Sequence, residues 1–175
     1  AISAKNKNKK RKFKINKKIF YKNPFKILDN KKINILFECI GQSDGISKKI
    51  VEKALNNKIH VITPNKALIS KHGDYLSKIA ENKKVNLEFE ASVGGGIPIL
   101  RTIKEGLSTN VITKVYGILN GTCNYILSEM DKTSDNFRDV LKKAQSLGYA
   151  EPGDPKLDIN GYDTLAKVRI LSSLA

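Results

Sequence analysis

Short apolar runs alternate with amphipathic segments along the first half of this 175-residue chain, and this alternation limits the fold more than any other feature. Residues 33–40 are mostly apolar and end at Gly41, which is typical of a strand buried on both faces of a parallel sheet. Residues 44–56 carry apolar side chains at helical spacing, and residues 60–63 form the next apolar run. The pattern predicts a right-handed βαβ unit.

A second predicted helix at residues 67–82 and a third strand at residues 85–90 extend the alternation. Elements of these lengths in this order predict an α/β fold with a doubly wound sheet. Residues 1–4 suit a further short strand, and residues 5–18 form a lysine-rich loop. We therefore predict that residues 1–92 are a partial Rossmann-like nucleotide-binding domain.

The pattern changes after the glycine run at residues 94–96. The predicted elements beyond it are a helix at 97–105, a strand at 111–120, a short helix at 125–131 and a longer helix at 136–147 that stops at Gly148 in a left-handed cap. We expect this mixed α+β region, residues 93–175, to form part of a second domain.

No G-x-G-x-x-G turn accompanies the predicted sheet, and residues 93–96 lack the spacing of that fingerprint. A βαβ fold without a phosphate loop is expected if the chain begins inside the nucleotide-binding domain. The last apolar helix reaches Ala175 without a C-terminal cap. We therefore expect a chain truncated at both ends.

Positive charge is concentrated at the N-terminus, where residues 1–32 hold 13 Lys or Arg and one acid of a chain whose net charge is +15. Such a block is the usual footprint of a nucleic-acid contact. A composition rich in lysine throughout gives the same appearance. No recognition helix or aromatic platform accompanies the charge, so we do not expect a nucleic-acid partner.

The remaining composition indicates a globular protein, with 40% hydrophobic residues and mixed charge. No apolar run approaches the roughly 20 residues of a membrane span, and no signal-peptide pattern follows the basic N-terminus. Cys39 and Cys123 lie far apart and form no CxxC motif. We expect a soluble, cytoplasmic protein without a membrane partner.

Asp163 and Lys167 are four residues apart in a predicted helix over residues 161–171, so they share one helix face. A lysine beside carboxylates can be kept charged and pointed at a polar substrate, as a proton donor to a carbonyl requires. The plainer alternative is a solvated surface pair, because such spacings are common on exposed helices.

Several motifs in one order resemble those of homoserine dehydrogenases. The segment from Gly148-Tyr149-Ala150-Glu151 through Asp158, Gly161 and Asp163 to Ala166-Lys167 is similar to the substrate-site signature of that family. Three further segments resemble its cofactor domain, hinge and catalytic-domain entry: residues 63–68, 89–99 and 117–127. The resemblance covers the chain from about residue 33 to its end, and it implies that residues 93–175 begin the catalytic domain.

The resemblance implies reversible, NAD(P)H-dependent reduction of aspartate 4-semialdehyde to homoserine, in threonine, methionine and isoleucine biosynthesis. Lys167 matches the family's general acid, with Asp163 as its anchor. Lys66 matches a second active-site lysine near the cofactor. Glu151 matches the residue that holds the substrate ammonium, and Asp158 reinforces it. Between Glu151 and Asp158 this chain has one residue more than the family pattern, which affects their relative placement.

The resemblance also implies a monovalent cation such as Na⁺ at the hinge, with four matching positions: Glu90, Val93, Gly95 and Ile97. Glycines at such a place can instead serve tight backbone geometry alone. Lys5 follows a short apolar segment, where a cation suits the 2′-phosphate of NADP, and Asn6 stands where an NAD site favours an acid. NADP is therefore preferred to NAD.

Family members are oligomers, so a homo-oligomer is implied for the full-length protein. Three alternatives remain open: an inactive truncated remnant of the enzyme, a basic nucleic-acid-binding module, and a dehydrogenase acting on another amino-acid aldehyde. The polar loop at residues 120–124 has no assigned role, and turn formation is its default interpretation.

Overall fold

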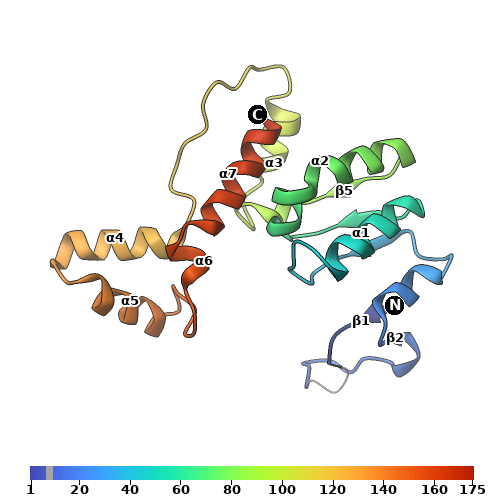
Figure 1. The fold of residues 1–175 in the computed structure, drawn as a ribbon, viewed down its shortest axis with the longest axis horizontal. Coiled ribbons are helices and arrows are strands. Elements are labelled where there is room, and N and C mark those ends of the chain that lie inside the picture. The colour runs from blue at the N-terminus through green and yellow to red at the C-terminus, as the bar shows by residue number, and fades with distance from the viewer. Residues whose placement is uncertain (7–9) are drawn as a thin grey trace. The chain divides into compact units, whose positions relative to one another are not determined.

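The chain is described by a computed structural model that covers residues 1–6 and 10–175. It divides into two compact units, Ala1–Ser92 and Val93–Ala175, and each is considered by itself (Figure 1). Helices and parallel strands occur together, so the expected α/β fold class is confirmed. No helix in the described part of the chain is both long and apolar enough to cross a membrane.

The first unit contains a parallel sheet of three strands in the order β3-β4-β5, namely Ile35–Phe37, His60–Ile62 and Leu87–Glu88. Helix α1 (Ile46–Asn56) connects the first two strands and α2 (Lys66–Lys83) connects the last two. The two helices contact each other and lie side by side in Figure 1. Sequential order and right-handed crossovers place both helices on one face of the sheet.

This one-sided arrangement corrects the expectation that residues 33–40 are a strand buried on both faces. In β3 only Leu36 is buried, while Ile35 is exposed and Phe37 is 68% exposed. An edge strand with helices over a single face buries alternate side chains. The third strand is also shorter than expected, because Glu90–Ser92 turns into a 3₁₀ helix, η3.

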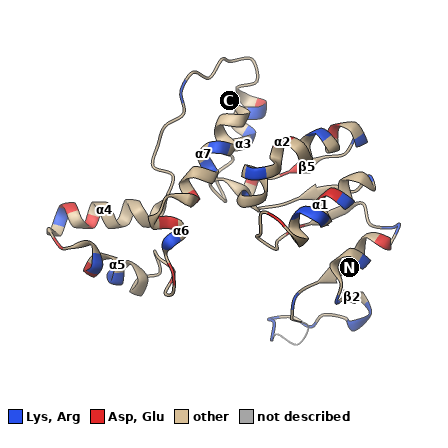
Figure 2. Cartoon of the chain, in the orientation of Figure 1, with Lys and Arg blue, Asp and Glu red and all other residues tan. Residues whose placement is uncertain are grey.

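The N-terminal segment forms a second, two-stranded parallel sheet in which β1 (Ile2–Ser3) pairs with β2 (Phe20–Tyr21). Two short 3₁₀ helices, η1 (Lys17–Ile19) and η2 (Pro24–Asp29), flank β2, and η2 contacts α1. The strand expected at residues 1–4 is thus present. Lys and Arg residues also lie on the helices of both units, so they are not confined to the first 32 residues (Figure 2).

The second unit, all of whose residues are described, consists of helices and loops. A short helix α3 (Ile99–Arg101) continues into a π-helix, η4 (Thr102–Gly106). Four helices follow: α4 (Gly121–Thr133), α5 (Phe137–Ser146), α6 (Lys156–Ile159) and α7 (Tyr162–Leu174). Helices α4 and α5 pack together around a core of Ile126, Val140, Ala144 and Ala150. Gly148 has a φ of 81°, as expected for the residue that follows α5.

The strand expected at residues 111–120 is wrong. This segment is a long irregular connection between η4 and α4 (Figure 1), and none of the strands in the described residues pairs with it. Val111 is 89% exposed and Tyr116 is 85% exposed. Its β-branched and aromatic residues are typical of a strand, but a strand forms only where a partner edge supplies hydrogen bonds.

Leu55→Ala tests the core of the first unit, because Leu55 is fully buried on α1. The cavity left behind is expected to lower the free energy of unfolding by about 2–5 kcal/mol in urea denaturation. Ile46 on the same helix is exposed, so Ile46→Ala is the matched control and is expected to change stability by less than about 1 kcal/mol. Equal losses in the two variants would contradict this packing.

Asp44, just before α1, accepts hydrogen bonds from Lys71 Nζ at 2.7 Å, Ser43 Oγ at 2.7 Å and His72 Nε2 at 2.9 Å. The bonds from Lys71, Ser43 and His72 hold the pKa of Asp44 well below its usual range. A depressed carboxyl pKa stabilises the fold above the unfolded value of about 3.9, and this contribution is lost as pH falls toward the folded value.

Asp44→Asn is therefore expected to lower the melting temperature at pH 7, with the difference from the parent shrinking as pH falls below about 4. Asp74→Asn, an exposed acid on α2, serves as the control and is expected to change the melting temperature little at either pH. Thermal melts recorded from pH 2 to pH 7 measure both. A loss for Asp44→Asn that does not depend on pH would contradict the electrostatic origin.

Candidate active site

Asp163 and Lys167 form an ion pair inside the second unit. Asp163 lies in the first turn of α7, and its Oδ2 is 2.7 Å from Lys167 Nζ one turn later. The two side chains are only 6% and 18% exposed. Lys167 Nζ also donates a hydrogen bond to the carbonyl oxygen of Leu119 at 2.6 Å. The alternative of a solvated surface pair is therefore wrong.

A second carboxyl group joins this pair through Asn120, the N-cap residue of α4. Asn120 Nδ2 donates to Asp158 Oδ1 at 2.8 Å and to Asp163 Oδ2 at 2.9 Å. Asp158 belongs to α6, so the amino end of α4 meets side chains from α6 and α7. The structure thus brings together three of the residues expected at the site: Asp158, Asp163 and Lys167.

The first turn of α4 adds two more polar groups to this cluster. Thr122 Oγ1 donates to the carbonyl oxygen of Tyr149 at 2.6 Å and lies 3.3 Å from Asp158 Oδ2. Cys123 Sγ lies 3.4 Å from the carbonyl oxygen of Asp158. Burial, followed by the charges of Asp158 and Asp163, raises the pKa of the Cys123 thiol. The thiol therefore stays protonated at neutral pH.

Glu151 lies in the exposed loop after α5, and its contacts differ from those of Asp158 and Asp163. Its backbone oxygen accepts a hydrogen bond from Gln145 Nε2 at 3.0 Å, and the Tyr149 ring stacks on Tyr125 with centroids 4.5 Å apart. The bond from Thr122 to Tyr149 ties this loop to the cluster. Among the described residues, no hydrogen bond or ion pair engages the Glu151 side chain. Its carboxyl group is exposed rather than gathered with Asp158 and Asp163.

In the first unit, Lys66 is the first residue of α2 and follows the carboxyl end of β4. Its side chain is half-buried. Asn65 is the N-cap of α2, and its Oδ1 accepts the backbone N–H of Leu68 at 3.1 Å. Ligands of parallel α/β sheets bind at the carboxyl ends of the strands. Lys66 therefore stands at the edge where a nucleotide is expected.

A buried acid that the sequence did not single out organises this edge. Glu38, just after β3, is 2% exposed, and both of its carboxyl oxygens accept hydrogen bonds. The donors come from four places around it: Ile40 N at 2.7 Å, Ser47 Oγ at 3.1 Å, Thr63 Oγ1 at 2.7 Å and Asn65 Nδ2 at 3.3 Å. Glu38 thus connects the ends of β3 and β4 to the starts of α1 and α2. The sequence feature that could have identified Glu38 is an acidic residue at the end of an apolar strand.

Lys5 is exposed two residues beyond β1. This places it after the two-stranded sheet and not after a strand of the β3-β4-β5 sheet. The lysine-rich stretch that follows includes residues 7–9, which lie outside the described residues.

The four residues expected to bind a cation divide between the units. Glu90 begins η3 in the first unit, while Val93, Gly95 and Ile97 open the second, where Gly95 has a φ of 54°. Val93 is buried and the Ile97 side chain is exposed. The described residues contain no group of three or more His, Cys, Asp or Glu side chains able to hold a metal.

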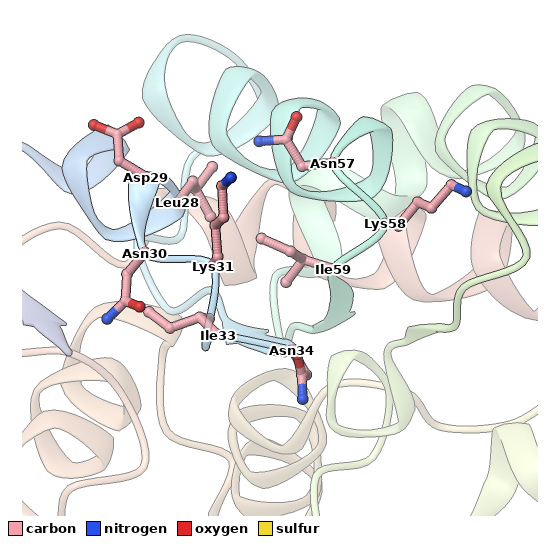
Figure 3. A pocket seen from close by; sticks show the side chains of 9 residues that line it. All are labelled: Leu28, Asp29, Asn30, Lys31, Ile33, Asn34, Asn57, Lys58 and Ile59. Atoms are coloured by element: carbon pink, nitrogen blue, oxygen red, sulfur yellow. The ribbon is translucent and has the colours of Figure 1, made fainter.

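A cavity of about 400 Å³ lies elsewhere in the first unit, between the segments that precede β3 and β4 (Figure 3). Its lining includes Asp29, Lys31, Asn34 and Lys58 around the apolar side chains of Ile33 and Ile59. Residues 33–34 and 58–59 stand at the amino ends of the strands. The cavity therefore lies at the amino ends of the strands, whereas Lys66 lies at their carboxyl ends.

Parallel strands joined by crossover helices are a Rossmann-type architecture, which binds nucleotides at the carboxyl ends of its strands, where Lys66 lies. Residues 1–90 match the family model "Homoserine dehydrogenase, NAD binding domain", and residues 98–175 match the model "Homoserine dehydrogenase". The chain belongs to the homoserine dehydrogenase family.

Curated relatives and solved structures agree with this membership. The chain is 46% identical to a homoserine dehydrogenase of Neisseria gonorrhoeae, covering 89% of this chain and 35% of the relative. It is 40% identical to that of Bacillus subtilis, covering 99% of this chain and 40% of the relative. It therefore spans little more than a third of the length of these relatives.

The crystal structure of a homoserine dehydrogenase from Thiobacillus denitrificans superimposes with a TM-score of 0.82 at 45% identity, covering 88% of this chain and 35% of that one. A hyperthermophilic archaeal homoserine dehydrogenase in complex with NADPH gives a TM-score of 0.80 at 29% identity, covering 87% and 46%.

Glu38→Gln tests the organisation of the carboxyl edge. The amide keeps the size of the side chain but replaces one acceptor with a donor that faces donors, so we expect a loss of about 1–3 kcal/mol in the free energy of unfolding. Glu88→Gln on β5, where the side chain is exposed, is the control and is expected to be nearly neutral. Urea denaturation of both variants measures the difference, and equal stabilities would contradict the role of Glu38.

Proposed function

We propose that the protein containing this chain is a homoserine dehydrogenase in activity, reducing aspartate 4-semialdehyde to homoserine reversibly with NADPH or NADH. The observation that carries the proposal is the ion pair of the buried Asp163 with the partly buried Lys167, beside Asp158. The chain spans only about a third of the length of its relatives, so the reaction is proposed for the full-length protein.

Lys167 is the proposed general acid. An ammonium group has three N–H donors, and among the described residues two of them are engaged, by Asp163 and by the Leu119 carbonyl. The third can be donated to the aldehyde oxygen of the substrate, which becomes an alkoxide as it is reduced. Lys167 then transfers a proton to that oxygen, while Asp163 holds the lysine in place.

Glu151 and Asp158 are proposed to hold the substrate ammonium. A carboxylate is the simplest specific partner of an amino group. The exposed carboxyl group of Glu151 is available to an entering ligand, and Thr122 ties its loop to the cluster through Tyr149. Asp158 lies next to the lysine pair, so an ammonium held there leaves the aldehyde end of the substrate near Lys167.

Residues of the first unit suit a nicotinamide dinucleotide, since the half-buried Lys66 starts a helix at the carboxyl edge of the sheet. When bound, the cofactor supplies the hydride. Lys66 would be a second active-site lysine that contacts the cofactor, and Lys5 would meet the 2′-phosphate of NADP.

Three further features belong to the same proposal. A monovalent cation would be bound by Glu90 with the carbonyls of Val93, Gly95 and Ile97. The full-length protein would be a homo-oligomer. It would work in the cytoplasm, which suits two cysteines that are both free thiols in the structure.

Oxidation of NADPH in the presence of aspartate semialdehyde, followed at 340 nm with the full-length protein, tests the proposal. Lys167→Ala is expected to lower kcat by about 10²–10⁴-fold, the usual contribution of a general acid. Lys143→Ala is the matched control, because Lys143 in the same unit is paired with Glu129 on the exposed α4–α5 surface. The parent and the control should turn over alike.

Absence of turnover in the parent protein would reject the activity. Full turnover in Lys167→Ala would leave the activity in place but remove Lys167 from the role of proton donor.

A further inference from the structure

Asn120 uses every hydrogen-bonding group of its side chain inside the cluster. Its Oδ1 accepts the backbone N–H of Cys123 at 2.8 Å, which caps α4. Because the oxygen is committed to the cap, the Nδ2 group faces the other way and donates to Asp158 and Asp163. The residue is only 6% exposed. Turn formation, its default interpretation from the sequence, requires the oxygen alone.

We propose that Asn120 is a positioning residue of the active site, whose amide holds the Asp158 and Asp163 carboxyl groups together and thereby fixes Lys167. The inference rests on the proposed function and extends it. Asn120 touches neither reacting atom; it acts through the two acids and the lysine.

Electrostatics explain why an amide suits this position. Two carboxyl oxygens lie 2.8 and 2.9 Å from a single nitrogen, so the two acids are close neighbours that repel each other when both are charged. The two N–H groups of Asn120 and the ammonium of Lys167 offset that repulsion. A rotation of Asp163 away from Asn120 would also move its partner Lys167.

The charged and titratable groups that face Asn120 come from three helices. They are Cys123 on α4, Asp158 on α6, and Asp163 and Lys167 on α7. The Tyr149 loop contributes only a backbone carbonyl, through Thr122.

Asn120→Asp separates the two roles of the side chain, because Asp caps helices as well as Asn does. The cap oxygen is kept, but the donor is replaced by a third acid between two others. The crowded acids are expected to take up a proton, so the acid limb of the pH–kcat profile should move to higher pH. We expect kcat at neutral pH to fall by about 10–100-fold, which is the loss that misplaced catalytic groups cause. KM should change by a smaller factor.

Asn120→Ser provides a second variant without added charge. Serine also caps helices well, but its short hydroxyl cannot donate to both acids. We expect a smaller fall in kcat and no shift of the acid limb. Asn136→Asp is the matched control: Asn136 caps α5 and its Nδ2 donates to Asp139, but this pair is exposed and outside the cluster. It should leave kcat and the pH profile unchanged.

The Cys123 thiol gives a readout that does not require activity. The pH dependence of the alkylation rate of Cys123 by iodoacetamide, read by mass spectrometry of the peptide that contains it, reports the pKa of this one thiol, and Asn120→Asp should raise that pKa further because a third acid lies beside it. This measurement tests whether the side chain at position 120 lies beside the acids and Cys123, and it can be made even if the parent protein shows no turnover. Absence of turnover would reject the proposed function instead.

Folded Asn120→Asp and Asn120→Ser variants with the kcat and pH profile of the parent would overturn the inference and leave Asn120 as a helix cap. An unchanged Cys123 pKa in Asn120→Asp would overturn it as well.

Discussion

A carboxyl group removed from water needs hydrogen-bond donors for its oxygens, and both units of this chain meet that need at the amino end of a helix. Asn65 caps α2 with its oxygen and donates its amide to Glu38. Asn120 caps α4 in the same way and donates to Asp158 and Asp163. In each unit, the residue that starts a helix also holds a buried acid in place. Helix position and acid position are therefore coupled.

In each unit, this coupling relates the position of a helix to a lysine of the candidate site. In the first unit, Glu38 brings the ends of β3 and β4 to the starts of α1 and α2, and Lys66 follows directly on the capping residue. In the second unit, the acids joined by Asn120 hold Lys167. An acid kept in place by several donors provides a fixed partner for Lys167, the proton donor that we propose.

Periodic apolar residues predicted the helices well. Helices α1, α2, α5 and α7 lie within a few residues of their expected bounds, and α1, α2 and α5 each bury one apolar stripe. Strands were predicted less well. Residues 111–120 have strand-forming composition but no partner edge, and β3 is covered on one face only. Whether an extended segment becomes a strand depends on residues that are distant in the sequence.

The candidate active site likewise combines features that the sequence predicted with features that it did not. Spacing alone placed Asp163 and Lys167 on one helix face, and the motifs marked Asp158, Glu151 and Lys66. The low exposure of the pair, the donation by Asn120 and three of the four donors around Glu38 were decided by tertiary structure, since these contacts join residues 9 to 48 positions apart. Local sequence determines which side chains share a helix face. Only the packing of helices and strands removes water from around a charge and thereby determines which donors it needs.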